Sequence, residues 1–426
     1  MDIRALPQHL AVTTALILAL CLLMLLGVAG HAQADCKPDF VADQVIVKLK
    51  RGTTVTQINT TYSSTTLEQF PGSKDTYLLG LPAGSNVLNT VKQMASDPLL
   101  LFAEPNFFSQ SPEGGARHHA WGVSSDAPTS GDYAAKALGL EDAHKITRGE
   151  GTTVAVLDTG AQLDHPALAA NFEGVKRYDF VDNDKNPSER PARNDADCDG
   201  EKDEMLGHGT HVAGTVDITA PAAKIMPLRV LDTEGYGDVF TIAKAVYFAR
   251  GNGADVINLS LGSPSRSSLL QEVIKGATAN GVLIAAAAGN SNSPVPQYPA
   301  AGNGLAASAE GLVAVTSVNQ YDRKSDFANY GGWVDIAAPG EGIRSAFPVS
   351  VYANWSGTSM ATPFVSGQAA LIHSVYGSLK PAGVEEKIRC SARSLRTTDP
   401  VYAAVLGAGR ADVDDSLAPG DCSLLV

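Results

Sequence analysis

The sequence predicts an α/β fold with a mainly parallel sheet covered by helices on both faces, preceded by a small α+β unit. From residue 139 onward, short apolar runs typical of buried strands alternate with segments of helical spacing. Such alternation is typical of βαβ units packed around a parallel sheet. Residues 44–107 alternate in a similar way over a shorter length, and a stretch rich in Gly, Ser, Pro and Ala at residues 108–132 separates the two regions.

In the larger region, strands are expected at short apolar runs, and helices where apolar residues recur every three or four positions. The predicted strands are residues 153–157, 225–230, 256–260, 282–287, 313–318 and 334–337, and the predicted helices are residues 240–249, 267–279 and 361–373. Ligand sites of parallel sheets lie beyond the carboxyl ends of the strands. Asp158, Ser260 and Asn290 each lie at such an end and are therefore candidates for function.

The N-terminal region is expected to form strands at residues 45–50, 77–81 and 99–103 and helices at residues 53–62 and 86–95. The chain is therefore divided into a signal peptide (1–34), a small α+β unit (35–110), a linker (111–132) and the larger domain (133–426).

The first 34 residues have the features of an export signal. Arg4 supplies a basic start, residues 10–30 are uncharged and apolar, and Ala32-Gln33-Ala34 offers the small residues that a signal peptidase needs. We expect a secreted mature chain, extracellular or periplasmic, with no stable membrane association. The alternative is an uncleaved anchor, because about 20 apolar residues can span a bilayer.

Composition limits the partners of the chain. Its net charge of −13 repels nucleic-acid phosphates, so nucleic acid is not an expected partner. The chain is also expected to be a monomer. The cysteines outside the signal are Cys36, Cys198, Cys390 and Cys422, in a compartment expected to be oxidising. Three pairings are possible, of which Cys390 with Cys422 would tie down the C-terminus.

Three short motifs supply an acid, an imidazole and a hydroxyl. Asp158 follows a strand in VAVLDTG, His208 opens a predicted helix in GHGTHVAG, and Ser359 precedes another in SGTSMATP. A serine hydroxyl is a poor nucleophile at neutral pH, so it needs a base within hydrogen-bond reach and a carboxylate that orients the base. The three residues together predict a serine peptidase.

Asn290 is the candidate donor for the negative charge that develops on a carbonyl oxygen during acyl transfer. It directly follows the buried strand in AAAAGN. The backbone N–H of Ser359, at a helix N-terminus, is the expected second donor.

These motifs resemble the catalytic signatures of the subtilisin-like serine peptidases, the subtilases. The resemblance extends from about Trp121 to GAGRADV at residues 407–413 and covers most of the mature chain. It implies a subtilisin-like fold and a serine endopeptidase that acts on polypeptides and needs no cofactor for its chemistry. Residues 37–110 resemble the family's prodomain, a folding aid and intramolecular inhibitor whose last strand, residues 101–107 in this sequence, would enter the active-site groove. Self-cleavage is expected within residues 108–132.

The resemblance also implies where a substrate binds. An extended peptide is expected to pair by strand addition with the edge formed by Ser260, Leu261 and Gly262. The pocket for the side chain before the cut bond is expected to be lined by Ala287, Ala288 and Gly289. Because that run carries no charge, an apolar or broad preference is expected.

An acidic stretch, NDADCDGEKDE at residues 194–204, is a candidate structural calcium site. Asp195, Asp197 and Asp199, followed by Gly200, match the opening of a calcium-binding loop. The twelfth position is Leu206, where an EF-hand has a bidentate Glu, so a complete EF-hand is excluded. A different calcium cage and a solvated acidic loop both stay open.

Other interpretations explain fewer of these residues. The run around Asp158 also resembles an aspartic peptidase motif, but such an enzyme needs a second copy, which the sequence lacks. His208 and His211 have a spacing that can bind zinc, yet the i, i+4 pair with an intervening Glu is missing. A catalytically silent binding or processing scaffold remains an alternative, as does an N-terminal unit kept as a permanent accessory domain.

Overall fold

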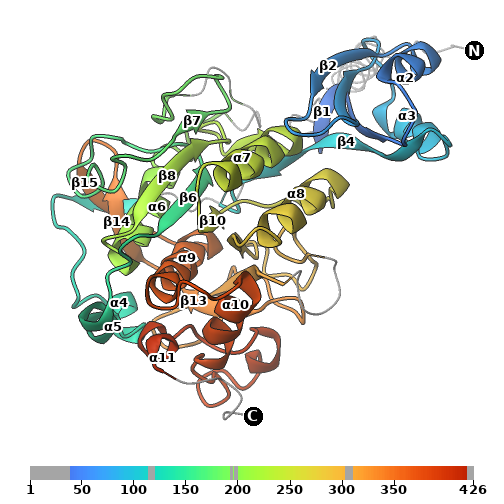
Figure 1. The fold of residues 1–426 in the computed structure, drawn as a ribbon. Helices are drawn as coiled ribbons and strands as arrows, with labels where there is room; N and C mark the ends of the chain where they lie inside the picture. Colours follow the sequence, from blue (N-terminus) through green and yellow to red (C-terminus); the bar gives the residue numbers. More distant parts are fainter. Residues whose placement is uncertain (1–38, 114–119, 192–194, 196–199, 303–309, 420–426) are drawn as a thin grey trace, which may run out of the picture. The chain divides into compact units, whose positions relative to one another are not determined.

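The computed structural model describes residues 39–113, 120–191, 195, 200–302 and 310–419 (Figure 1). Within these residues a parallel sheet of seven strands has the order β13-β12-β11-β10-β6-β8-β7. Its strands are β6 (Thr153–Asp158), β7 (Tyr178–Asp179), β8 (Lys224–Arg229), β10 (Val256–Leu259), β11 (Leu283–Ala287), β12 (Leu312–Val318) and β13 (Ile336–Pro339). The predicted parallel sheet is confirmed, and β7, a two-residue edge strand, is added to it.

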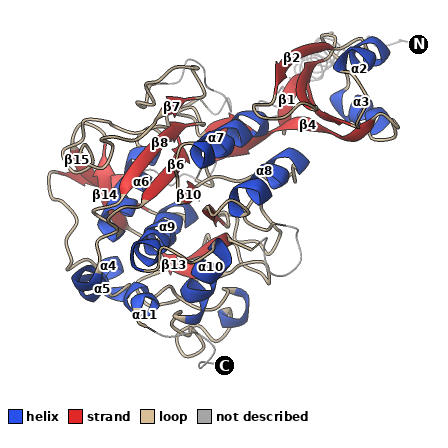
Figure 2. Cartoon of the chain, in the orientation of Figure 1, coloured by secondary structure: helices blue, strands red, loops and turns tan. Residues whose placement is uncertain are grey.

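Helices cover both faces of this sheet, as predicted (Figure 2). Side chains of β6 alternate between two cores, with Val154 and Val156 facing one and Ala155 and Leu157 facing the other. The first core is closed by α6 (His208–Thr219) and α9 (Thr358–Val375), and the second by α7 (Val239–Gly251) and α8 (Ser268–Thr278). Because strands buried on both sides carry apolar residues throughout, they read as unbroken apolar runs in the sequence.

Helix α9 is the central helix of the first core. Its first 15 residues, Thr358 to Ile372, are all buried, and it packs against α6 and against β10, β11 and β12. A helix enclosed on all sides carries apolar or small residues around its whole circumference. Its N-terminus is therefore held rigidly at the edge of the sheet. Shorter helices surround this core: α4 (Tyr133–Ala137), α5 (Leu140–Ile146), α10 (Pro381–Cys390), α11 (Val413–Leu417) and the 3-10 turn η1 (Ala403–Val405).

The N-terminal unit has its own antiparallel sheet and core. Its elements are β1 (Phe40–Leu49), α2 (Val55–Tyr62), β2 (Thr65–Gln69), β3 (Thr76–Gly80), α3 (Val87–Met94) and β4 (Leu100–Gln110), with strand order β2-β3-β1-β4. Helix α2 begins with a capping box in which the Thr54 side chain accepts from the Gln57 backbone N–H. The α+β prediction is confirmed, although β2 was not predicted.

Strand β4 is longer than the sequence indicates. The apolar pattern predicts a strand at residues 99–103, and the family resemblance carries it to residue 107. The observed β4 continues to Gln110, and its last part pairs with β9 (Tyr236–Asp238) of the larger region. Those backbone partners lie more than a hundred residues away in the sequence, so no local pattern encodes the extension. The strand passes without a break from the small unit to the larger one.

A further small sheet lies within regions that lack a clear sequence pattern. It is antiparallel, with the order β14-β15-β5, and consists of β14 (Ile343–Phe347), β15 (Val351–Trp355) and β5 (Trp121–Ser124). Strand β5 falls in the stretch that is expected to lack regular structure. Its four residues, WGVS, are too few to indicate a strand by themselves, and they form one by pairing with β15.

None of the helices formed by the described residues is both long and apolar enough to cross a membrane. The predicted signal at residues 1–34 lies outside the described residues. Cys390, the last residue of α10, takes part in a disulfide. Its pairing with Cys422 stays a prediction, because Cys36, Cys198 and Cys422 also lie outside the described residues.

Candidate active site

Three neighbouring strands bring the predicted site residues to one edge of the sheet. Strand β10 lies between β6 and β11, and all three run parallel. Asp158 is the last residue of β6, Ser260 follows β10, and Asn290 follows β11 after a short turn. Because parallel strands end at the same edge, these side chains share one rim, as predicted.

His208 is oriented by Asp158. The Nδ1–H of His208 donates to Asp158 Oδ1 over 2.7 Å, and the backbone N–H of Thr159 donates to the same oxygen over 2.7 Å. Both side chains are buried, and the indole of Trp355 packs edge-on against the imidazole at 5.4 Å between ring centroids. The ring therefore has one fixed orientation with Nε2 facing the site.

The first turn of α6 approaches the end of β6 so closely that position 209 requires glycine. A Cβ on Gly209 would lie 2.0 Å from the carbonyl oxygen of Gly160. The Gly209 N–H donates instead to Thr159 Oγ1 over 2.9 Å. The glycine beside the imidazole thus lets the helix that carries His208 dock on the loop that carries Asp158.

Glu189 is a half-buried carboxylate behind this pair that sequence reasoning missed. Its Oε1 accepts from Thr159 Oγ1 at 2.6 Å and from the Gly207 N–H at 3.1 Å, and its Oε2 accepts from Thr210 Oγ1 at 2.8 Å. Burial, together with the nearby charge of Asp158, raises the pKa of Glu189. It joins the loop that follows β6 to the start of α6. No motif surrounds it in the sequence, so only the fold reveals it.

Ser359 is the second residue of α9, as expected for a nucleophile at a helix start. Its Oγ donates to Glu113 Oε2 over 2.7 Å and lies 3.4 Å from the Ser260 carbonyl oxygen. His208 Nε2 lies 3.1 Å from the same Glu113 oxygen. The Ser359 hydroxyl and the His208 imidazole therefore both contact Glu113 Oε2. Ser260 Oγ in turn donates to the Ser359 carbonyl over 2.9 Å, which joins β10 to α9.

The amide of Asn290 is held with its NH₂ group facing Ser359. Its Oδ1 accepts from the backbone N–H and the Oγ1 of Thr358, each over 2.9 Å. Its Nδ2 donates to Glu113 Oε1 over 2.9 Å. Since Oδ1 is occupied by two donors, the amide has a defined orientation, and Nδ2 is placed to donate to an anionic oxygen beside the hydroxyl.

Glu113, the second residue that sequence reasoning missed, lies in the middle of this constellation. Its side chain is 1% exposed. Burial favours the neutral acid, but the hydrogen bond and charge of His208, with the hydroxyls of Ser111 and Ser359, outweigh it and lower the pKa of Glu113 to about 2. Burial likewise opposes charge on His208, yet Asp158 and Glu113 raise its pKa to about 10. The two carboxylates on either side of the ring therefore favour the protonated form of His208.

The predicted substrate edge is paired with the chain's own backbone. Gln110 forms an antiparallel bridge with Gly262 through two N–H···O bonds of 2.9 Å. On its other side the same segment pairs with β9, and the Ser111 N–H donates to the Gly235 carbonyl over 2.9 Å. The segment is thus held between two edges, as an added strand would be. The residues predicted to line the pocket, Ala287, Ala288 and Gly289, are also buried.

Strand β4 also places polar side chains at the N-termini of two helices. Glu104 accepts from the Ser268 N–H at 2.6 Å and the Leu269 N–H at 3.1 Å, at the start of α8. Asn106 Oδ1 accepts from the Phe240 N–H at 3.1 Å, at the start of α7. Both groups satisfy backbone donors that a helix leaves free at its first turn.

The two histidines with zinc-compatible spacing face different partners. His208 binds carboxylates, whereas the Nε2–H of His211 donates to the carbonyl oxygens of Ile343 and Ala353 at 2.9 and 3.2 Å. Burial lowers the pKa of His211 to about 3. His211 therefore joins α6 to the β14–β15 hairpin as a neutral group and does not share a ligand position with His208.

The acidic loop is described only in part. Asp195 Oδ2 accepts from the Gly200 N–H at 3.0 Å, and its Oδ1 is buried with no hydrogen-bond partner among the described residues. Asp197 and Asp199 lie outside those residues. In the described part of the chain, no group of three or more His, Cys, Asp or Glu side chains is arranged to hold a metal ion. An unpartnered buried carboxylate oxygen fits a calcium ligand.

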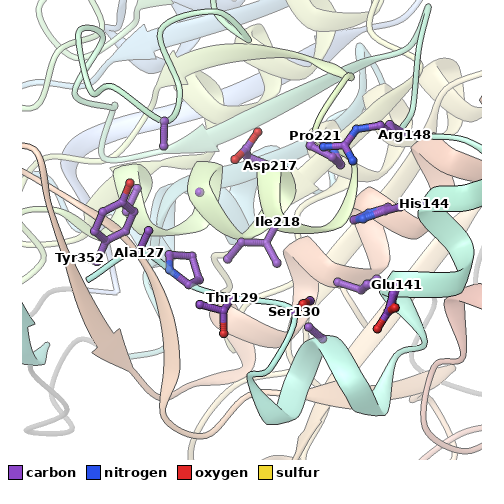
Figure 3. A pocket seen from close by; sticks show the side chains of 16 residues that line it. Ala127, Thr129, Ser130, Glu141, His144, Arg148, Asp217, Ile218, Pro221 and Tyr352 are labelled. Carbon is purple, nitrogen blue, oxygen red and sulfur yellow. The ribbon is translucent and has the colours of Figure 1, made fainter. Parts of the chain in front are cut away.

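A separate cavity of about 270 Å³ lies beside α5 and α6 (Figure 3). Its lining includes Arg148, Asp217 and Tyr352, and none of the candidate catalytic residues contributes to it. Burial raises the pKa of Asp217 to about 6. The cavity is therefore distinct from the candidate active site.

Comparisons with known proteins agree with this geometry. The model of the subtilase family, Peptidase S8, matches residues 149–409, and the model of the fervidolysin N-terminal prodomain matches residues 27–106. A thermophilic serine proteinase of Bacillus sp. (strain AK1) is 37% identical over 300 residues, which cover 68% of this chain and 67% of the relative. Thermitase of Thermoactinomyces vulgaris is 40% identical over 246 residues, which cover 58% of this chain and 83% of thermitase.

A solved structure matches over most of this chain. Fervidolysin from Fervidobacterium pennivorans, described as a keratinolytic enzyme related to subtilisin, matches with a TM-score of 0.69 at 22% identity, over 89% of this chain and 61% of the other. At that identity the likeness speaks for the fold alone. The family matches, taken with the meeting of acid, imidazole and hydroxyl, show that the chain belongs to the subtilase family and is a serine endopeptidase with an N-terminal prodomain.

Proposed function

We propose that Asp158, His208 and Ser359 form the catalytic triad. The observation that carries this proposal is the position of His208, whose Nδ1 binds Asp158 while its Nε2 and the Ser359 hydroxyl meet on one oxygen atom. In the reaction, Ser359 Oγ attacks the scissile carbonyl, and His208 takes the hydroxyl proton and returns it to the leaving amine. Asp158 keeps the ring in the required tautomer and stabilises the imidazolium.

Asn290 is the proposed side-chain donor to the oxyanion, with the backbone N–H of Ser359 as its partner. In support, Asn290 Nδ2 already donates to an anionic oxygen beside Ser359 Oγ. Donors that are held in place before the reaction need no reorganisation as charge develops, which is why they lower the barrier.

Peptide substrates are proposed to bind as an added strand between Gly262 and β9. The chain's own residues 108–111 pair with these two edges, which supports the geometry. Ser260, Leu261 and Gly262 form the edge, and Ala287, Ala288 and Gly289 the pocket for the side chain before the cut bond. None of the six carries a charge, so the proposed preference is apolar or broad. Faster cleavage after Arg than after Leu or Phe in a peptide library would contradict it.

The N-terminal unit, residues 35–110, is proposed to act as an intramolecular inhibitor and folding aid, followed by a linker at 111–132. The course of β4 along the site supports inhibition. Self-cleavage within residues 108–132 would then produce the mature enzyme, residues 133–426 being its main body. The proposed location is outside the cell or in a periplasm, after removal of residues 1–34. The enzyme is proposed to act as a monomer, without nucleic acid, and with calcium at Asp195, Asp197 and Asp199.

The test compares wild type with Ser359→Ala, using intact mass and N-terminal sequencing before and after a serine-directed phosphonate. Wild type is expected to gain the phosphonate mass and to lose its N-terminal unit; Ser359→Ala is expected to do neither. Ser394→Ala, at an exposed serine, serves as the matched control. Trimming of Ser359→Ala at the wild-type position, without added peptidase, would disprove self-processing. A wild-type protein that stays unlabelled in every form would favour the catalytically silent scaffold.

A further inference from the structure

Glu113 contacts the same side chains that the scissile peptide group of a substrate is proposed to contact. Its Oε2 accepts from Ser359 Oγ at 2.7 Å and Ser111 Oγ at 2.6 Å, and lies 3.1 Å from His208 Nε2. Its Oε1 accepts from Asn290 Nδ2 at 2.9 Å. Of these four partners, all except Ser111 have a proposed catalytic role. One carboxylate therefore engages the nucleophile, the base and the oxyanion donor together.

The space around Glu113 is matched to an acceptor oxygen. A Cβ on Gly357 would lie 1.8 Å from Glu113 Oε1 and 3.1 Å from Asn290 Nδ2. The glycine just before α9 thus leaves room for one oxygen atom between the helix start and the Asn290 amide. A carboxylate has two oxygens with shared negative charge, so it satisfies the donors meant for an oxyanion.

The backbone that carries Glu113 is bound in the way expected of a substrate strand, up to Ser111. Gln110 pairs with both β9 and Gly262, and Ser111 donates to Gly235. Beyond that point the group that reaches Asn290 is the side chain of Glu113 and not a backbone carbonyl. The segment thus pairs as a substrate strand would, while a side-chain carboxylate, which cannot be cleaved, takes the place of the scissile carbonyl.

We propose that the Glu113 carboxylate is a built-in inhibitory ligand of the active site, which holds the precursor bound but uncleaved until this side chain leaves. The inference rests on the proposed catalytic roles of Ser359, His208 and Asn290. It adds to the blocking of the groove by backbone pairing, because a side-chain ligand can be removed without altering that pairing.

We call the contacts of Glu113 with Ser359, His208 and Asn290 the latch. The latch disables each catalytic group. The Ser359 proton is directed to Glu113 instead of His208. His208 has a carboxylate on each of its two nitrogens, which favours the imidazolium, and an imidazolium cannot act as a base. Asn290 Nδ2 is occupied. Loss of Glu113 from the site restores all three groups together, so the latch acts as a single switch on maturation.

The experiment uses the full-length precursor and its Glu113→Gln and Glu113→Ala variants. Ser359 labelling by a fluorophosphonate and release of the N-terminal unit are both followed by intact mass from the moment of purification. Glu113→Gln keeps the shape and the backbone pairing but removes the charge, and Glu173→Gln, an exposed carboxylate on another loop, is the matched control. We expect both Glu113 variants to be labelled and processed about tenfold faster or more, since hydrogen bonds to a charged group are the stronger ones.

Equal labelling and processing rates in wild type and both Glu113 variants would overturn the latch and leave backbone pairing as the whole inhibition. A second readout needs no variant: in wild type, the phosphonate mass should appear on the mature species and not on the precursor. Labelling of wild-type precursor as fast as the mature form would also overturn it. Failure of the proposed function is distinguishable, because then no species, mature or precursor, takes up the phosphonate or cleaves a peptide.

Discussion

At the scale of single residues, the chemical groups identified from the sequence and those revealed by the fold differ in kind. Short runs of small residues at strand and helix ends surround Asp158, His208 and Ser359. The local sequence is therefore enough to identify these three as candidates. Glu113 and Glu189 lie in irregular segments with no such context. Their roles depend on partners brought close by folding, such as Ser359, which is 246 positions from Glu113.

The oxyanion role gives a prediction for Asn290. In the mature enzyme, Asn290→Ala should lower kcat about 10²–10³-fold with little change in KM, the range known for loss of one such donor in subtilisin. The reason is that Nδ2 contributes mainly once charge has developed on the carbonyl oxygen. Steady-state kinetics on a peptide anilide measure this, with exposed Asn280→Ala as control. A rise in KM with unchanged kcat would instead assign Asn290 to ground-state binding.

At the scale of elements, β4 connects the prodomain to the helices of the enzyme. Its Glu104 and Asn106 accept from the first turns of α8 and α7, and its end pairs with β9 and with Gly262. The contacts around this interface differ in burial. Glu104 is 6% exposed, whereas the ion pair of Lys244 with Glu68 is more open to solvent. Buried charge-assisted hydrogen bonds contribute more than exposed pairs, which water and salt screen.

Glu104→Gln should therefore destabilise the precursor more than Glu68→Gln does. Measured in the Ser359→Ala background, which prevents self-digestion, Glu104→Gln is expected to lower the free energy of unfolding by about 1–3 kcal/mol, because buried donors at α8 lose their anionic acceptor. Glu68→Gln, the control, is expected to cost at most about 1 kcal/mol. Thermal or urea unfolding measures both. Equal losses in the two variants would contradict the capping role of Glu104.

The latch predicts a pH dependence of maturation. The pKa of Glu113 is lowered from 4.5 to about 2, so the stabilisation that its ionised carboxylate gives to the latch is complete above pH 4.5 and is lost as the pH falls towards 2. The pKa of His208 is raised from 6.5 to about 10, so the stabilisation that its protonated ring gives to the latch is complete below pH 6.5 and is lost as the pH rises towards 10. The latch should be tightest between pH 4.5 and 6.5. The other ionisable groups that act on this pair are Asp158, Glu189 and His211.

Between pH 6.5 and 10, processing of the precursor should therefore accelerate more steeply than peptide hydrolysis by the mature enzyme. The ratio of the two rates removes the ordinary titration of the base. Glu113→Gln serves as the control and should show a flat ratio, because the ion pair is absent. A ratio that does not change with pH in wild type would count against the ion pair as the source of the latch.

At the scale of the whole molecule, the loop that contains Asp195 is the part whose stability is expected to depend on a ligand. One carboxylate oxygen of Asp195 is buried without a partner among the described residues. Such an oxygen destabilises the folded state unless a cation is bound to it. A ligand that binds only the folded state stabilises it by mass action.

Removing calcium should lower the melting temperature of the protein and speed its autolysis. At calcium one hundred times above its Kd, the stabilisation lost is about 3 kcal/mol. Thermal unfolding with and without a calcium-selective chelator measures the loss, and Asp195→Asn should abolish the response. Exposed Asp415→Asn is the matched control, at a carboxylate outside this loop. If the chelator leaves both melting temperature and autolysis of wild type unchanged, the loop is a solvated acidic segment.

From the amino-acid order alone, the fold class and the proposed triad could be derived, because buried strands, helix starts and small residues around reactive groups are local properties. The length of β4, the strand β5 and the positions of Glu113 and Glu189 could not, because each depends on a partner that only the folded chain supplies. Contacts between distant segments are chosen by the packing of the whole core. For that reason the local sequence identifies the proposed catalytic groups, whereas their inhibition by Glu113 depends on contacts that exist only in the folded chain.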